Sequence, residues 1–232
     1  MTCCVFCVNM IKIKKAAQAL RKALPLNALI LPFPVKKVMK CLKVWKDGKW
    51  YSIKLIETNK IPYQAEAVTF NDGNIIKVLI VKDYEKHFSS KRKRWTLMHE
   101  LSHICLGHSF VPGSSLTDVM RWYLDKESNK LTREVLLWDK HVKDWLFEGE
   151  KLSPLKKSYM AHAFGVSQEA LDNTLSEYGI INSNNNHACP FYPNILECIS
   201  KSARKKCFAR NKPHKRCYNK TLETDFNIKL TL

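Results

Sequence analysis

Residues 91–108 read KRKRWTLMHELSHICLGH, and this stretch decides the fold expected for the chain. Its apolar residues recur at helical spacing, which predicts one helix over the whole stretch. Counting about 100° per residue from His99, His103 lies at about 40° and Glu100 at about 100°, while the apolar residues fall between about 140° and 260°. The helix is therefore expected to have one polar face for chemistry and one apolar face buried in the core.

His99, Glu100 and His103 form an HExxH motif within this helix. Residues four apart on a helix lie about 5–6 Å apart on the same face, near enough for two imidazoles to bind one metal ion. Catalytic zinc takes three protein ligands and keeps a fourth position for water, so a third ligand must come from elsewhere in the chain. A motif this short also occurs by chance, and a surface histidine pair is the competing interpretation.

A longer similarity surrounds the motif. Residues 92–108 resemble the RxRFTLAHELGHLLLGH signature of the ImmA/IrrE family of metallo-endopeptidases, with Trp95 where phenylalanine is common and Ser102 where glycine is common. Residues 127–138, ESNKLTREVLLW, resemble the family's EANRFAAELLMP helix. This second segment departs from the family's small-aromatic-small pattern and from its closing proline at Ser128, Leu131, Thr132 and Trp138.

The resemblance extends over roughly residues 60–181. AVTF at 67–70 and VLIV at 78–81 are similar to the strands that precede the motif in the family, and residues 161–180 are similar to its closing LAxxFgVSxxAlxxRLxxLG segment. The resemblance implies an α+β, zincin-like metallopeptidase domain. In such a domain a small mixed or antiparallel sheet packs on the HExxH helix, and here a helical segment and a basic tail containing cysteines would follow.

The resemblance also implies roles for single residues. Zinc is expected on His99, His103 and Glu127, of which Glu127 matches the family's third ligand, with Glu134 as the reserve. A zinc ion held in this way polarises the scissile carbonyl and lowers the pKa of its water toward about 7. Glu100 is then the expected catalytic base, which accepts the proton of the water and passes it to the leaving amine.

Other polar residues have weaker claims to a role. His108 falls about 180° from His99 on a continuous helix, so we expect it not to be a ligand but to lie near the carbonyl dipole of the helix end. The residue that stabilises the transition state has no sequence signature here. Tyr159, His141 and His162 are candidates by residue type alone, and each is more often structural.

The chain is expected to divide into three regions. Residues 1–60 form a basic N-terminal segment with an amphipathic helix at 12–24 and a hairpin turning at Asp47-Gly48. Residues 61–181 form the metallopeptidase domain, in which QAEAVTF and IIKVLIV make a second hairpin and helices occupy most of 117–147. Two short helices follow, capped by Ser153 and Ser167. Residues 182–232 form a basic, cysteine-rich tail.

The net charge of +18 is carried by the two ends of the chain. Residues 1–60 have 13 lysines and arginines against 2 acids, residues 61–181 have 16 against 16, and residues 182–232 have 10 against 3. Basic ends can bind nucleic acid or an acidic partner, although a solubilising surface is the plainer interpretation.

No membrane partner is expected, because the chain has no apolar run of about 18 residues. The apolar stretch at 3–8 lacks the basic lead-in of a secretory signal. Nine cysteines without an export segment favour a reducing cytoplasm.

The tail contains a weak second metal motif formed by Cys189, Cys198, Cys207 and Cys217. The gaps of eight and nine residues between these cysteines lack the paired CxxC of zinc ribbons, so free thiols or a disordered tail are the alternatives. Basic residues interleaved with Phe208 and Tyr218 would also suit nucleic acid.

The function implied by the resemblance is that of a cytoplasmic zinc endopeptidase. Members of this family cleave a helix-turn-helix repressor, often one encoded by a phage or mobile element, and so relieve transcriptional repression. Two alternatives remain open. One is a regulatory protein that keeps the metal fold without proteolysis, and the other is a nucleic-acid-binding protein that acts through its basic ends.

Overall fold

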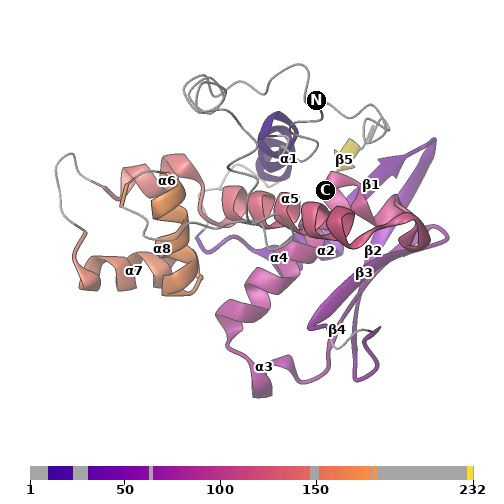
Figure 1. Ribbon diagram of the computed structural model, residues 1–232, viewed down its shortest axis with the longest axis horizontal. Helices are drawn as coiled ribbons and strands as arrows, with labels where there is room; N and C mark the ends of the chain where they lie inside the picture. The colour runs from indigo at the N-terminus through magenta and orange to yellow at the C-terminus, as the bar shows by residue number, and fades with distance from the viewer. Residues whose placement is uncertain are drawn as a thin grey trace.

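The computed structural model describes residues 10–22, 31–62, 65–146, 152–178, 180–181 and 229–231. A five-stranded sheet lies on one side of helices α4 and α5, and helices α6 to α8 gather at the opposite end of the molecule (Figure 1). In chain order the elements are α1 (Met10–Lys22), α2 (Val35–Cys41), β1 (Lys43–Lys46), β2 (Lys49–Thr58), β3 (Ala67–Asp72), β4 (Ile75–Val81), α3 (Tyr84–His87), α4 (Ser90–Leu106), η2 (His108–Phe110), η3 (Gly113–Ser115), α5 (Asp118–Leu136), α6 (Asp139–Asp144), α7 (Pro154–Phe164), α8 (Gln168–Glu177) and β5 (Lys229–Thr231).

The sheet has the order β3-β4-β2-β1-β5. Two hairpins supply four of its strands, and β5 pairs antiparallel with β1 at the other edge. In the first, β1 and β2 are antiparallel around Asp47 and Gly48, whose φ angles of 47° and 80° belong to the tight turn that suits a hairpin. In the second, β3 and β4 are antiparallel across a turn that contains Gly73. Both predicted hairpins are therefore confirmed. The hairpins join through a parallel pairing of β2 with β4, which makes the sheet mixed and places β3 at one edge.

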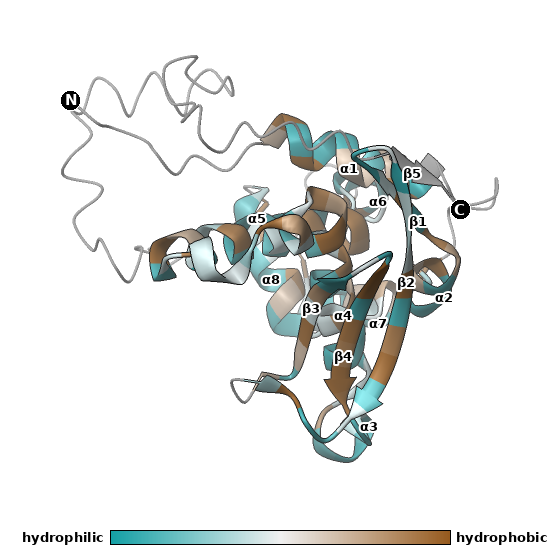
Figure 2. Ribbon diagram, turned by 90° about the vertical axis from the view of Figure 1, so that its right-hand side faces the viewer, coloured by the Kyte–Doolittle hydropathy of each residue, from teal (hydrophilic) through white to brown (hydrophobic). Residues whose placement is uncertain are grey.

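One face of the sheet is buried against α4. Alternate residues of β4 point to this face, and Ile76, Val78 and Ile80 are almost completely buried there. The apolar side of α4 supplies Met98 and Leu101 to the same core, as the helical spacing predicts. Figure 2 shows the hydrophobic colouring of β4 and of much of β2. Each large apolar side chain buried in this way contributes about 1.5–3 kcal/mol, so the sheet holds α4 firmly in place.

The remaining helices extend this core. Helix α5 packs along α4, and α1 packs on α5. Ser153 and Ser167 cap α7 and α8 by accepting hydrogen bonds from backbone N–H groups, as predicted. Phe164 of α7 and Leu171 of α8 belong to the same hydrophobic cluster as the sheet. The two short helices therefore form part of the main packing unit.

The regions expected at 1–60 and 61–181 share one sheet and one core. Strands β1 and β2 come from the first region, and β2 pairs with β4 from the second along seven residue pairs. Helix α1 begins at Met10, two residues before the expected 12–24 span, and overlaps that span as far as Lys22. Helix α2 is a short helix that the sequence did not predict, since prolines 32 and 34 indicated a loop. No helix of the described residues is both long and apolar enough to cross a bilayer. The cysteines proposed as a second metal site lie outside the described residues.

Candidate metal centre

Helix α4 carries the HExxH motif and has well-defined ends. Ser89 caps its start by accepting a hydrogen bond from the backbone of Arg92. At its other end Gly107 takes the left-handed conformation, with φ 82°, and donates to the carbonyl groups of the last turn. The helix therefore ends at Leu106, two residues earlier than predicted, and the chain reverses direction at Gly107.

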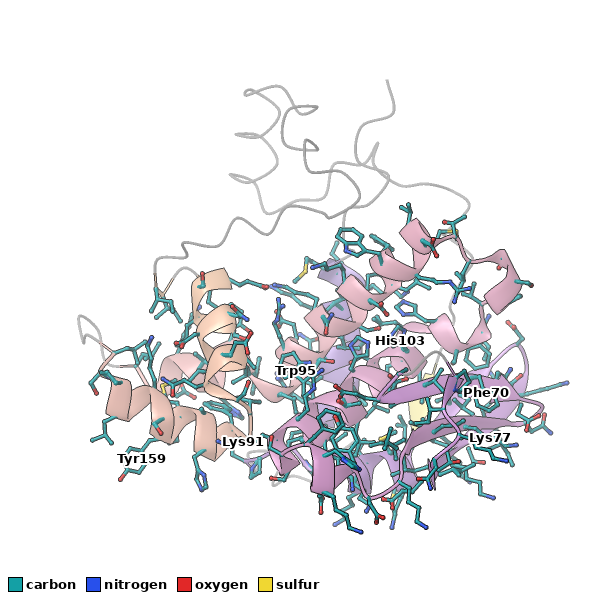
Figure 3. All side chains as sticks on the ribbon, turned by 60° about the horizontal axis from the view of Figure 1, so that its bottom comes forward. Phe70, Lys77, Lys91, Trp95, His103 and Tyr159 are labelled. Atoms are coloured by element: carbon teal, nitrogen blue, oxygen red, sulfur yellow. The ribbon has the colours of Figure 1, made fainter. Side chains whose placement is uncertain are left out.

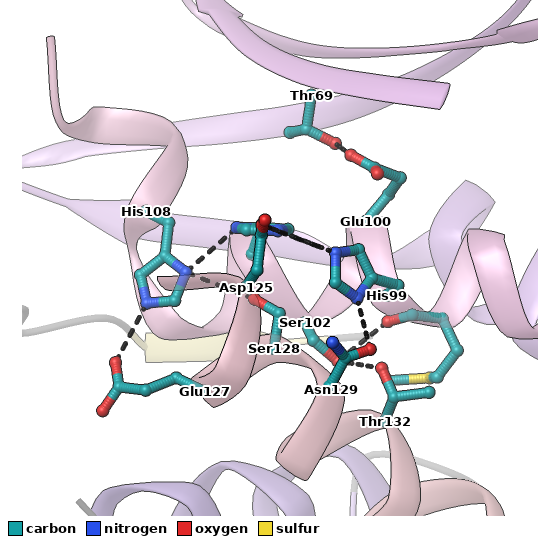
Figure 4. A network of polar contacts seen from close by, with 12 residues as sticks. Thr69, His99, Glu100, Ser102, His108, Asp125, Glu127, Ser128, Asn129 and Thr132 are labelled. Atoms are coloured by element: carbon teal, nitrogen blue, oxygen red, sulfur yellow. Dashed lines mark hydrogen bonds and ion pairs between the residues drawn. The ribbon is translucent and has the colours of Figure 1, made fainter. Parts of the chain in front are cut away.

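His99 and His103 point toward each other from consecutive turns of α4, as predicted. Their Nε2 atoms are 3.0 Å apart. Asp125 of α5 faces both rings, with its Oδ1 atom 3.3 Å from Nε2 of His103 and 3.8 Å from Nε2 of His99. Among the described residues, these three side chains form the group whose ligand atoms all lie within 4.8 Å of one another. Figure 4 shows the arrangement.

The third side chain at the imidazole pair is thus Asp125, whereas the expected ligand was Glu127. The reason lies in helix geometry, because residues two apart point about 200° away from each other around α5. Asp125 and Asn129 are four apart and share the face toward α4, where Asn129 contacts His99. Glu127 instead contacts His108, and the reserve candidate Glu134 lies near the positive charge of Arg21.

His108 occupies a different place from the one expected. Because the chain reverses at Gly107, His108 lies beside His103, and their Nδ1 atoms are 3.0 Å apart. Its Nε2 atom lies 3.2 Å from a carboxylate oxygen of Glu127. Burial lowers the pKa of His108 to about 3, in spite of the nearby carboxylate, so its ring is neutral. His108 is not among the three clustered ligand residues, as expected, but it lies beside His103 rather than on the opposite side of the helix from His99.

Glu100 lies on the side of α4 that faces the sheet edge. Its Oε2 atom accepts a hydrogen bond of 2.6 Å from the hydroxyl of Thr69, which belongs to the edge strand β3. The carboxylate is largely buried, yet it borders a pocket of about 330 Å³ that also reaches His99. The pocket is lined on its other sides by Ala67 of β3 and by Trp95 of α4, among others.

A second carboxylate, Glu66, forms the rim of this pocket. It accepts hydrogen bonds from Arg92, Tyr84 and Thr96. Burial by itself would raise the pKa of Glu66, but these donors outweigh it and hold the pKa below its usual value. Glu66 is therefore a fully partnered anion that joins the start of β3 to α4, so it is poorly suited to act as an acid or base.

The electrostatics of the three clustered groups favour a cation. Burial alone would lower the pKa of His99, but the neighbouring Asp125 and Glu100 carboxylates and Asn129 raise it above its usual value. Burial by itself would raise the pKa of Asp125, but the two imidazoles hold the pKa of this carboxyl well below its usual value. A carboxylate that is ionised and 59% exposed thus lies next to two imidazole nitrogens.

The candidates for a transition-state stabiliser do not line the pocket beside Glu100. Tyr159 is 64% exposed on α7, at the far end of the molecule from His103 (Figure 3). His162 lies exposed on the same helix, and His141 is buried against Trp138. The structure therefore gives none of these three residues a place at the candidate centre.

The donor set suits zinc. Two imidazole nitrogens and one carboxylate oxygen match the three protein ligands of a catalytic zinc site, and the exposure of Asp125 leaves the centre open to solvent on one side. Asp125 carries one sequence signal, its spacing of four residues from Asn129 on an amphipathic helix. The resemblance of residues 127–138 to the family's EANRFAAELLMP helix had instead indicated Glu127, two residues further along the chain.

No protein-family model matches this chain, and no curated protein sequence shows significant similarity to it.

Proposed function

We propose that this protein is a zinc-dependent endopeptidase of the ImmA/IrrE type. The observation that carries the proposal is the juxtaposition of His99, His103 and Asp125 beside Glu100 and an open pocket. When bound, zinc would supply a Lewis acid that polarises a carbonyl and acidifies water. A helical HExxH motif with an acidic third partner is one arrangement that supplies this chemistry.

Glu100 is the proposed general base. It follows His99 directly in the sequence, and its carboxylate borders the pocket that His99 also lines. In this position it can accept a proton from the attacking water and return it to the leaving amine. Thr69 holds one oxygen of Glu100, which leaves the other for the proton.

The edge position of β3 supports a peptide as the substrate. Within the described sheet β3 pairs with β4 only, so the backbone groups on its other side can accept an extended chain as an added strand. Ala67 of β3 lines the same pocket as Glu100. An extended segment bound there would pass beside the pocket that Glu100 and His99 line. The proposed substrate, a helix-turn-helix repressor, comes from the family resemblance.

The test combines metal analysis with one substitution. Purified protein should contain one zinc ion per chain, and Glu100→Gln should keep the zinc while losing cleavage of a repressor encoded beside its gene. A peptide library derived from cell lysate, read by mass spectrometry, serves as the substrate where the repressor is unknown. Wild-type protein that binds no divalent metal would refute the proposal, and so would a Glu100→Gln variant that cleaves at the wild-type rate.

A further inference from the structure

Two buried residues outside the ligand group are aligned with His103. The Nδ1 atom of His103 lies 3.0 Å from Nδ1 of His108, and Nε2 of His108 lies 3.2 Å from Oε2 of Glu127 (Figure 4). His108 is 5% exposed and Glu127 is 4% exposed. The other oxygen of Glu127 accepts a hydrogen bond of 3.1 Å from the hydroxyl of Tyr123. A chain of hydrogen bonds therefore runs from the metal-facing ring to an interior carboxylate.

The direction of this chain follows from what each group can donate. A carboxylate only accepts, so Nε2 of His108 must carry the hydrogen that it gives to Glu127. In the neutral tautomer that carries this hydrogen, Nδ1 of His108 is bare, and it lies 3.0 Å from Nδ1 of His103 and 3.3 Å from the hydroxyl of Ser128. It can therefore accept from Nδ1–H of His103. That assignment leaves Nε2 of His103, the atom that faces Asp125, without a hydrogen.

His99 is also expected to have a bare Nε2 atom, but a different partner fixes its tautomer. Its Nδ1 atom lies 3.1 Å from the side-chain oxygen of Asn129, which accepts and therefore requires a hydrogen on Nδ1. These tautomers are the ones in which both Nε2 atoms can bind a metal ion together with the Asp125 carboxylate.

Helix α1 places a cation near the interior carboxylate. A buried carboxylate is costly unless it is paired and hydrogen-bonded. Lys12 of α1 is a half-buried cation whose charge interacts with that of Glu127, and Tyr123 and His108 supply the hydrogen bonds. Both carboxylate oxygens of Glu127 therefore have hydrogen-bond partners, and a cation lies near the group.

We propose that His108 and Glu127 are positioning residues, which fix the orientation and the tautomer of His103 so that its Nε2 atom is presented to the metal ion. This inference rests on the proposed zinc site, and it gives Glu127 a role in place of the ligand role expected from the sequence. Outer partners of this kind commonly change metal affinity by about 10–100-fold when removed.

The test measures zinc affinity by competition with a chromophoric chelator. His108→Leu, which offers no acceptor to His103, should bind zinc about 10–100-fold more weakly than the wild type. His108→Asn has an amide oxygen close to the position of Nδ1, so it should keep affinity within a few-fold of the wild type. His141→Leu removes a different buried histidine and serves as the matched control for a general loss of packing.

A second measurement detects the hydrogen on Nδ1 of His103 directly. In ¹⁵N-edited spectra of the zinc-loaded protein, Nδ1–H of His103 should appear as a slowly exchanging signal in the wild type and in His108→Asn. It should exchange rapidly with solvent in His108→Leu. If His108→Leu alone does not fold, His108→Leu/Glu127→Gln avoids an unpaired buried carboxylate and should show the same two changes.

Three results would overturn the inference. Wild-type zinc affinity in His108→Leu would show that the chain of hydrogen bonds has no effect on the centre. Equal weakening in His108→Leu and His141→Leu would show a general packing defect. Failure of the wild type to bind zinc would refute the proposed function together with this inference, whereas the first two results leave the proposed function intact.

Discussion

The hydroxyl of Thr69 donates a hydrogen bond of 2.6 Å to Oε2 of Glu100, and so joins the edge strand of the sheet to the helix that carries the metal-facing histidines. Thr69 pairs with Val78 across the β3–β4 hairpin, and Val78 is buried on the helix-facing side of the sheet. The next residue, Phe70, is 39% exposed. The pleat of β3 therefore directs Thr69 toward Glu100, which orients the proposed base.

Removal of this hydroxyl should slow catalysis without loss of metal. In Thr69→Val the Glu100 carboxylate loses its fixed partner, and we expect kcat to fall about tenfold, which is less than the 10²–10⁴-fold contribution of a general base as a whole. Zinc content should stay at the wild-type value. Thr69→Ser keeps the hydroxyl and should retain most of the activity. Equal kcat in Thr69→Val and wild type would contradict the orienting role.

Replacement of Asp125 should weaken zinc binding more than any change in the outer partners. Asp125→Ala removes the carboxylate nearest both Nε2 atoms, so affinity should fall by more than about 100-fold, the upper range for outer partners. Asp118→Ala, at an exposed position near the start of the same helix, is the control. Chelator competition measures both variants. Wild-type affinity in Asp125→Ala would remove this residue from the centre.

Glu66 should make stability depend on pH in the acid range. Its pKa in the folded protein lies below the ordinary 4.5, so the unfolded chain binds more protons around that pH. The stabilisation by Glu66 is therefore complete above about pH 4.5 and is lost as pH falls through the folded pKa. At pH 7, Glu66→Gln should lower the free energy of unfolding by about 1.5–3 kcal/mol, a typical value for hydrogen bonds to a charged group.

Urea unfolding followed by circular dichroism at pH 7 and at pH 3 measures this effect. The difference between wild type and Glu66→Gln should shrink at the lower pH. Glu85→Gln changes a more exposed carboxylate and should have little effect at either pH. A difference that grows as pH falls would contradict the assignment.

Gly165 should tolerate no side chain. Its φ is +66°, and an added Cβ would lie 2.6 Å from Nη1 of Arg94 and 2.8 Å from Cβ of Pro32. Gly165→Ala should therefore lower the free energy of unfolding by about 1–3 kcal/mol, the sum of backbone strain and overpacking. Gly48 also has a positive φ but nothing within 4 Å of an added Cβ, so Gly48→Ala isolates the backbone cost. Thermal unfolding compares the two, and equal losses would rule out the steric contribution.

Local features of the fold were predictable because their causes are local. The turn at Asp47-Gly48, the serine caps at 153 and 167 and the apolar side of α4 each depend on residues within one or two turns of chain. The parallel pairing of β2 with β4 has no comparable signal. It joins segments more than 20 residues apart, and only the packing of the whole sheet on α4 selects it.

In the candidate metal centre, too, only the local features could be predicted from the sequence. The spacing of His99 and His103 on one helix is a local property, and the two rings meet as expected. The partner on α5 depends on how that helix is rotated against α4, which the sequence does not state, so Glu127 was expected where Asp125 lies. His108 was misplaced because the angular count ran through Gly107, where the helix has already ended.

The parallel pairing at the middle of the sheet also governs how the chain can be shortened. Strand β2 comes from the first 60 residues and lies between β4 and β1. Any shorter product that begins after β2 would leave the apolar strand β4 with unpaired backbone groups on the side that β2 covers. An uncovered apolar strand of this kind is prone to self-association. Translation starts or proteolytic cuts that remove β2 would therefore disrupt the sheet rather than release a smaller folded unit.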